Sequence, residues 1–168
     1  QASIAAITVI VDHPPWPMHH IDNAFWNHNS LSPGDVNGDG FDDYSVMHEG
    51  PDLFTVIFHP GPDGDEKTIW PKTIVGQGGN PEYSAIADFD GDGNFDVVAV
   101  GGDDGNQPLG VKVFWGPDPT SSMDGSTWTD SGVFPQTANQ GHYLYVEAHD
   151  VNADGLTDIV VGGRLQSN

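Results

Sequence analysis

The chain has 168 residues, no cysteine, and 25 acidic against four basic side chains, for a formal net charge of −21. Four cations cannot build the basic patch that nucleic acids and anionic membrane surfaces require, and no apolar run approaches the roughly 20 residues that span a bilayer. Without cysteine the chain can form no disulfide. Its 5 Trp, 4 Tyr and 8 Phe can form a hydrophobic core, which argues against disorder.

The predicted elements are short β-strands separated by turn signals rich in Gly, Pro, Asn and Asp. No stretch shows a sustained 3.6-residue apolar period, so we expect very little helix. In chain order the predicted strands are 7–11, 18–21, 30–32, 44–47, 54–58, 70–75, 83–87, 97–100, 111–115, 128–134, 143–148 and 159–161. Four short antiparallel strands per unit are typical of a β-propeller blade.

The strands group into one all-β, partial propeller segment. Half a blade is predicted over 1–24, whole blades over 29–75 and 82–135, and a second half blade over 143–165. Propellers usually close with about four to eight blades, and unpaired edges are avoided in folded proteins. We therefore expect further blades, either in a longer polypeptide, which we favour, or in other copies of this chain.

Three segments repeat the pattern D-x-[DN]-x-D-G-x-x-D, beginning at Asp35, Asp88 and Asp150 between the first and second strands of each unit. Oxygen side chains at positions 1, 3 and 5 converge on one point, position 7 can add its backbone carbonyl, and a glycine at position 6 permits the sharp turn. The aspartate at position 9 would supply the closing carboxylate. The predicted calcium ligands are Asp35, Asn37, Asp39, Phe41 and Asp43; Asp88, Asp90, Asp92, Asn94 and Asp96; and Asp150, Asn152, Asp154, Leu156 and Asp158.

These loops differ from EF-hands, which need a glutamate at position 12 and a flanking helix. Position 12 here is Val46, Ala99 or Val161, and β-rich apolar runs follow each loop. The alternative, an Asp/Gly turn without metal, would leave three or four carboxylates of each loop repelling one another. Three bound Ca²⁺ would bring the charge from −21 to −15, and the remaining acids would form a solvated surface.

Ligands of propellers usually bind on the face opposite such loops, which here comprises 22–29, 48–52, 76–82, 101–110, 135–142 and 162–168. Aromatic faces combined with carboxylates and amides suit sugar rings. The alternative is that these are ordinary solvated loops. The candidate ligand-binding residues are Trp26, His28, His48, Glu49, Glu82, Asp103 and His142.

Catalytic signatures are sparse. His28, His48 and His142 lie on the candidate face, where a transition metal or a general base would need them, but no two have a metal-binding spacing such as H-x₃-H. The sequence has no G-x-S-x-G, no phosphate-cradling loop and no cysteine nucleophile. Trp16, Trp70 and Trp128 recur at matching blade positions, which predicts core packing.

The segments 34–43, 87–96 and 149–158 resemble the FG-GAP/VCBS repeat family of calcium-binding β-propellers. Similar loops occur in integrin α-subunit propellers and in many secreted bacterial proteins. The integrin Phe-Gly…Gly-Ala-Pro signature is not visible, so the resemblance is to the secreted bacterial branch. Members of that branch include carbohydrate-binding lectins, adhesins and enzymes with sugar lyase or dehydratase activity.

Two functions follow as expectations. The first is a calcium-stabilised module that binds carbohydrate or a protein surface, or that assembles; the second is the propeller part of a larger sugar-modifying lyase or dehydratase. A transition metal held by His28, His48 or His142 would favour the enzyme. Extracellular calcium modules work at Kd about 10⁻⁴–10⁻³ M, so we expect a secreted or cell-surface location.

Overall fold

The computed structural model describes residues 8–10, 18–102 and 110–165, and over these residues the chain is built from antiparallel sheets. The N-terminal pair consists of β1 (Thr8–Ile10) and β2 (Met18–His20). The first sheet consists of β3 (His28–Gly34), β4 (Asp43–His48), β5 (Leu53–Ile57) and β6 (Lys72–Gln77). The second sheet consists of β7 (Pro81–Ala87), β8 (Asp96–Gly101), β9 (Val111–Trp115) and β10 (Thr129–Asp130), and the C-terminal pair of β11 (Gly141–His149) and β12 (Asp158–Leu165).

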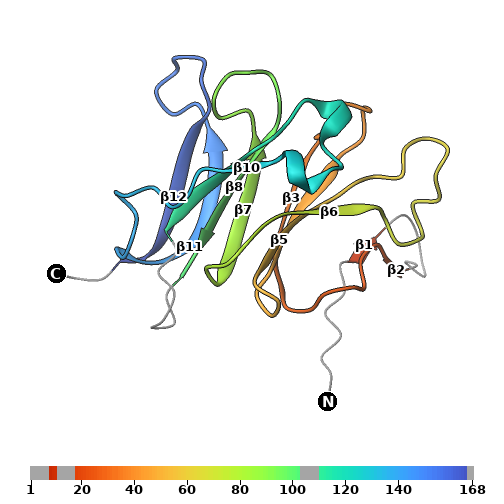
Figure 1. Cartoon of the computed structure of the whole chain (residues 1–168), viewed down its shortest axis with the longest axis horizontal. Helices are drawn as coiled ribbons and strands as arrows, with labels where there is room; N and C mark the ends of the chain where they lie inside the picture. Colours follow the sequence, from red (N-terminus) through yellow and green to blue (C-terminus); the bar gives the residue numbers. More distant parts are fainter. Residues whose placement is uncertain (1–7, 11–17, 103–109, 166–168) are drawn as a thin grey trace.

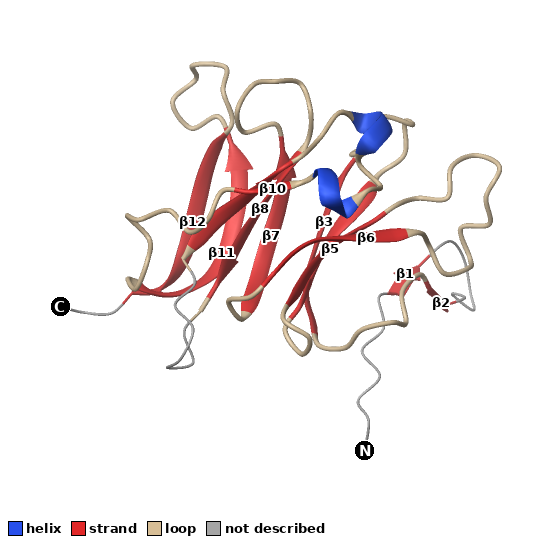
Figure 2. Ribbon diagram, viewed as in Figure 1, coloured by secondary structure: helices blue, strands red, loops and turns tan. Residues whose placement is uncertain are grey.

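The all-β prediction with four-stranded antiparallel sheets is confirmed, and each sheet keeps its strands in chain order, as blades of a propeller do. Within the described ranges the only helices are two 3₁₀ turns, η1 (Pro119–Ser121) and η2 (Gly125–Thr127). Figure 1 shows the two sheets and the C-terminal pair side by side, and Figure 2 the 3₁₀ turns at one end of them. No helix in the described part of the chain is long and apolar enough to cross a membrane.

Two expectations about strand bounds were wrong. The predicted fourth strand over 128–134 is regular only at Thr129–Asp130, because Gly132 adopts a φ of +69° and turns the chain. Its pairing with β9 continues irregularly through Ser131 N–H to Val113 O and Phe134 N–H to Val111 O, both 2.9 Å. The first strand of each unit also begins earlier than predicted, at His28, Pro81 and Gly141, so His28, Glu82 and His142 lie in strands and not in loops.

The first strands of the three units lie next to one another. Ser84 of β7 hydrogen-bonds through its hydroxyl to Ser30 of β3 at 3.2 Å and to Ser45 of β4 at 2.8 Å. On the other side of β7, the rings of Tyr83 and Tyr145 have centroids 5.7 Å apart. This neighbourhood of β3, β7 and β11 is the arrangement of innermost strands around a propeller axis.

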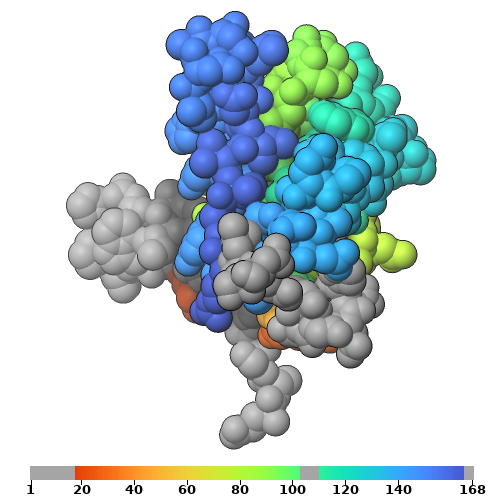
Figure 3. Space-filling view, turned by 90° about the vertical axis from the view of Figure 1, so that its left-hand side faces the viewer, coloured from red at the N-terminus to blue at the C-terminus, as the bar shows by residue number. Residues whose placement is uncertain are grey.

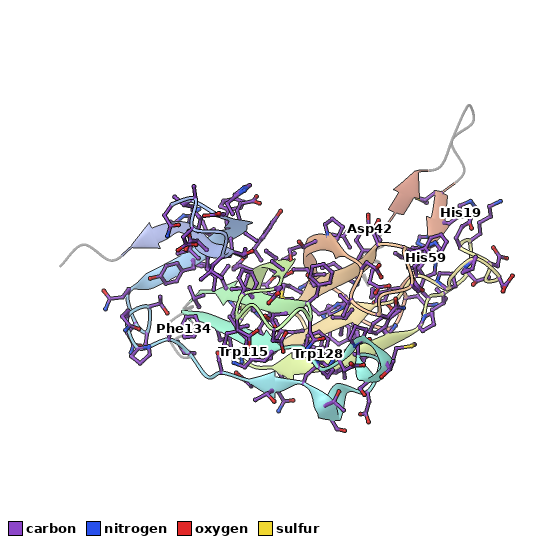
Figure 4. The ribbon with its side chains drawn as sticks, turned by 90° about the horizontal axis from the view of Figure 1, so that it is seen from above. His19, Asp42, His59, Trp115, Trp128 and Phe134 are labelled. Carbon is purple, nitrogen blue, oxygen red and sulfur yellow. The ribbon has the colours of Figure 1, made fainter. Side chains whose placement is uncertain are left out.

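The core lies between the sheets, and the two-residue period of the strands divides it. In β8, Val97 and Ala99 pack toward the first sheet, whereas Val98 and Val100 pack toward the C-terminal pair. Trp128 joins the first cluster, and Trp115 and Phe134 border the second, as Figure 4 shows from above. Trp70 and Trp128 are buried as predicted, and Trp16 lies outside the described residues.

Candidate functional site

The three acidic turns adopt the same local structure at one end of their sheets, the upper end in Figure 1. In each turn the backbone N–H of the position-6 glycine donates to the position-1 aspartate, at 2.9, 3.0 and 2.8 Å. The N–H groups of positions 5 and 7 donate to the side chains of positions 3 and 5. The position-6 glycine has a φ of +90° in all three copies, which only glycine adopts without strain.

In the first two turns the position-9 aspartate ties the base of the turn to the sheet, whereas Asp158 of the third turn accepts only from Val151 N–H, at 3.0 Å, among the described residues. Asp43 accepts from Val36 N–H at 3.0 Å and from His59 N–H, just beyond β5, at 2.8 Å. Asp96 repeats both contacts with Phe89 N–H at 2.9 Å and Gly116 N–H at 2.8 Å. Sequence reasoning gave these aspartates a ligand role alone; the structure adds a buried structural role.

Burial raises the pKa of the Asp43 carboxyl to about 6, and it raises that of Asp96 to about 6 as well. The carboxylates at positions 3 and 5 add to this effect, Asp39 for Asp43 and both Asp90 and Asp92 for Asp96. A nearby cation favours the charged form of a carboxyl group. The turns therefore concentrate negative charge that a bound cation would relieve.

The donor atoms of the turns fit a hard cation. In the second turn one carboxylate oxygen from each of Asp88, Asp90 and Asp96 lies within 4.8 Å of the others, so this acidic cluster can hold a metal ion. Carboxylate, amide and backbone carbonyl oxygens are the donors that Ca²⁺ takes in proteins. In the first and third turns the corresponding position-3 residues are Asn37 and Asn152, whose amide oxygens offer the same kind of donor with one charge fewer.

Three of the predicted ligand-binding residues gather at the opposite end of the strands. Asn29 donates from its amide to Pro81 O at 3.2 Å, and at 3.4 Å to the carboxylates of Glu49 and Glu82. Glu82 also contacts His142 Nε2 at 2.8 Å. We call Asn29, Glu49, Glu82 and His142 the polar cluster; it joins the starts of β3, β7 and β11.

Trp26 lies beside the polar cluster. The Glu49 backbone N–H donates to Asn27 O at 2.9 Å, and the indole of Trp26 lies so close to Gly50 that a Cβ there would overlap it. Trp26 as a whole residue is nevertheless 52 % exposed. His28 and His48 do not join this cluster but lie together in a second, buried one with Asp22, and Asp103 lies outside the described residues.

A β-bulge that recurs in the first strand of each unit accounts for the positions of Asn29 and Glu82. The sequence analysis did not single out Asn29, and it placed Glu82 in a loop. The register of β3 with β4 shifts between His28 and Ser30, that of β7 with β8 between Pro81 and Tyr83, and that of β11 with β12 between Tyr143 and Tyr145. A bulge re-aims the extra residue's side chain. The extra residue of the bulge lies at the same distance before the first aspartate of each acidic turn. This constant distance is the sequence signal that could have located Asn29 and Glu82.

Comparison with protein-family models matches residues 35–99 and 88–161 to the FG-GAP-like repeat. The two matches together span more than half of the chain, and each begins at the first aspartate of an acidic turn. The chain therefore belongs to the FG-GAP-like repeat family, whose repeats commonly bind calcium. A search of curated proteins finds no significant match.

Proposed function

We propose that this chain is a calcium-stabilised part of an extracellular β-propeller that binds carbohydrate on the face opposite its calcium turns. The observation that carries the proposal is the polar cluster. It draws side chains from both sheets and from the C-terminal pair to one place, beside an exposed tryptophan. Because β3, β7 and β11 each run from this place to an acidic turn, the binding face and the calcium turns lie at opposite ends.

Calcium in all three turns is part of the proposal. It is supported by the hydrogen bond from the position-6 glycine to the position-1 aspartate that all three turns share, by their oxygen-only donors and by the raised pKa values of Asp43 and Asp96. Residues at positions 1, 3, 5, 7 and 9 would hold each ion. When bound, calcium supplies charge neutralisation and fastens the turn between two strands. Extracellular calcium would fill such sites, which supports a secreted or cell-surface location.

The chemistry of the polar cluster favours sugar hydroxyl groups. Carboxylates accept hydrogen bonds from hydroxyls, the Asn29 amide and the His142 ring can donate to them, and Trp26 offers an apolar face for C–H stacking. Glu49 and Glu82 would repel an anionic polymer. We therefore propose neutral or amino sugars, not acidic polysaccharides, as the ligands.

A glycan array probed with the calcium-loaded chain tests this binding, followed by titration of the best glycan. We expect Trp26→Ala and Glu82→Gln each to weaken binding about tenfold, since loss of about 1.4 kcal/mol is a factor of ten. Met123→Ala, which removes a side chain of similar exposure (53 %) near the 3₁₀ turns, is the matched control. Binding unaffected by both substitutions, or no glycan bound by the folded chain, contradicts the proposal.

A second candidate function rests on the contact between His142 and Glu82. The two side chains are 24 % and 20 % exposed, with 2.8 Å between Nε2 and Oε1. A carboxylate that orients an imidazole is a common arrangement for a general base. Such a base would serve a larger sugar lyase or dehydratase. Formation of unsaturated sugar products from a bound oligosaccharide, abolished by His142→Gln, would favour this enzyme over the binding module.

Further propeller blades are the proposed protein partners. Tyr145 of β11 is 62 % exposed, and Val160 of β12 is also exposed, although β-strands in a propeller pack on both faces. These apolar side chains lie on the C-terminal pair, which faces the viewer in Figure 3. We propose that strands of a neighbouring blade cover them, in the same polypeptide or in another copy.

A further inference from the structure

The feature that carries a further inference is the cluster of Asp22, His28 and His48, which we call the His–Asp cluster. Each side chain offers one ligand atom, and the three atoms lie within 4.8 Å of one another. His28 begins β3 and His48 ends β4, and the two residues are direct cross-strand partners. Asp22 follows β2, so the N-terminal segment brings the carboxylate to the hairpin.

The cluster is buried, yet several of its polar atoms have no hydrogen-bond partner among the described residues. The side chain of Asp22 is fully buried, that of His28 is 8 % exposed, and His48 is fully buried. The unpartnered atoms are Asp22 Oδ2, both ring nitrogens of His28, and His48 Nδ1. Leaving buried polar atoms unpaired is costly, and clustered unpaired atoms require an explanation such as an ion.

The hydrogen bond at the other nitrogen of the His48 ring leaves Nδ1 able to bind a metal ion. His48 Nε2 lies 2.8 Å from the Thr55 hydroxyl. That hydroxyl donates its own hydrogen to Val46 O, at 3.5 Å. If Nε2–H donates to Thr55, Nδ1 carries the free lone pair, as in metal-ligating histidines held by a second partner.

Lys72 holds the carboxylate without occupying its free oxygen. The ammonium group contacts Asp22 Oδ1, and the Ala24 N–H donates to the same oxygen at 3.0 Å. Oδ2 is thereby directed to the His28 side, where it lies 3.5 Å from Nε2.

That distance is close to one edge of a tetrahedral site. Two donors bound to zinc at about 2.0–2.1 Å lie about 3.3–3.4 Å apart. Two imidazoles and a carboxylate suit zinc and its first-row neighbours, and not calcium, which prefers oxygen. The Phe25 ring meets that of His48 edge-on, with centroids 4.9 Å apart, and Phe25 and Lys72 also line a surface hollow next to the cluster.

We propose that Asp22, His28 and His48 bind a divalent transition metal, Zn²⁺, at a site separate from the calcium turns. A water molecule would complete the tetrahedron, since the described residues provide three ligands. The ion fastens the segment before β3 to the hairpin of β3 and β4. It lies at the end of the sheet opposite the first calcium turn, so each end of the hairpin is held by its own metal.

The test is Co²⁺ and Zn²⁺ titration of the full chain in saturating calcium, which keeps the oxygen sites occupied. We expect one Co²⁺ per chain with the intense visible absorption of four-coordinate cobalt, displaced by Zn²⁺, and a zinc-dependent rise in Tm. His28→Ala, which removes a ring without a hydrogen-bond partner, should weaken metal binding more than about 100-fold. Thr55→Val, which removes the hydroxyl that orients the His48 ring, should weaken it about 10–100-fold. His149→Ala, which removes an exposed imidazole, should change nothing.

Circular dichroism separates loss of the metal from loss of the fold, and His48→Ala serves as the second ligand variant. Three results would overturn the proposal: only the weak absorption of six-coordinate cobalt, Co²⁺ affinity unchanged in folded His28→Ala, or no effect of zinc on Tm. Sugar binding is measured on the same zinc-free chain. Its presence there leaves the carbohydrate proposal intact even when the zinc proposal fails.

Discussion

The carboxylate of Asp43 accepts a hydrogen bond from the backbone N–H of His59 at 2.8 Å, which ties the first acidic turn to the end of β5. Figure 4 labels His59 close to Asp42, the neighbour of this aspartate. Asp96 makes the same bond to Gly116 N–H at the end of β9, also at 2.8 Å. The first two acidic turns are therefore bonded to their sheets, and whatever orders either turn also stabilises its sheet.

Asp96→Ala should destabilise the chain strongly. The substitution leaves the N–H groups of Phe89 and Gly116 without their acceptor in a buried setting, and each such loss costs about 1–3 kcal/mol. We expect the free energy of unfolding in calcium to fall by about 2–4 kcal/mol, measured by urea denaturation. Asp63→Ala, at an exposed aspartate of the 58–71 connection, should change it by less than about 0.5 kcal/mol. Equal effects of the two substitutions would contradict this account.

Ala153→Gly should stabilise the third turn. Ala153 has a φ of +62°, whereas glycine occupies the same position in the other turns, as Gly38 and Gly91. The left-handed conformation costs an L-residue about 1–2 kcal/mol, and glycine's extra freedom in the unfolded chain offsets part of the gain. We expect a gain of about 0.5–1 kcal/mol and tighter calcium binding at this turn. A lower Tm in the variant would refute the prediction.

Gly76→Ala should disrupt the packing between the two sheets. A Cβ at Gly76 would overlap the ring of Phe114, which is fully buried in the core between them. Overpacking of this kind typically costs about 1–3 kcal/mol. Gly162→Ala is the matched control, because Gly162 also lies in a strand and nothing is within 4 Å of an added Cβ. Thermal denaturation of the two variants should separate them, and a Gly76→Ala chain as stable as the control would show that the sheets are not packed here as described.

The acidic turns were predictable from sequence because the hydrogen bonds that shape each turn join residues at positions 1 to 7 of the same turn. Positions 1 to 9 determine the turn, and the glycine at position 6 marks its backbone conformation. The family match and the four-stranded sheets followed from the same regular spacing. The strand ends were less predictable, because Pro81 and His142 are paired by their neighbours and not by their own propensities.

The sequence singled out His28 and His48 as candidate transition-metal ligands, but it did not predict that they join Asp22 in the His–Asp cluster. His28 and His48 are 20 residues apart and meet only through the register of β3 with β4, which includes a bulge at Asn29. Asp22 belongs to no recognisable sequence motif, and it joins the two histidines through tertiary packing of the segment beyond β2. A search for short histidine spacings therefore overlooks a site whose spacing is set by a hairpin.

Calcium titration of the metal-free chain, followed by calorimetry and by Tm, tests the central claim most directly. The account predicts three calcium ions per chain and a Tm that rises with calcium, because a ligand at 100 times its Kd stabilises by about 2.7 kcal/mol per site. Replacing the position-1 aspartate of one turn, as in Asp88→Ala, should lower the stoichiometry to two. A Tm that does not change up to millimolar calcium, with no heat of binding, would contradict the account.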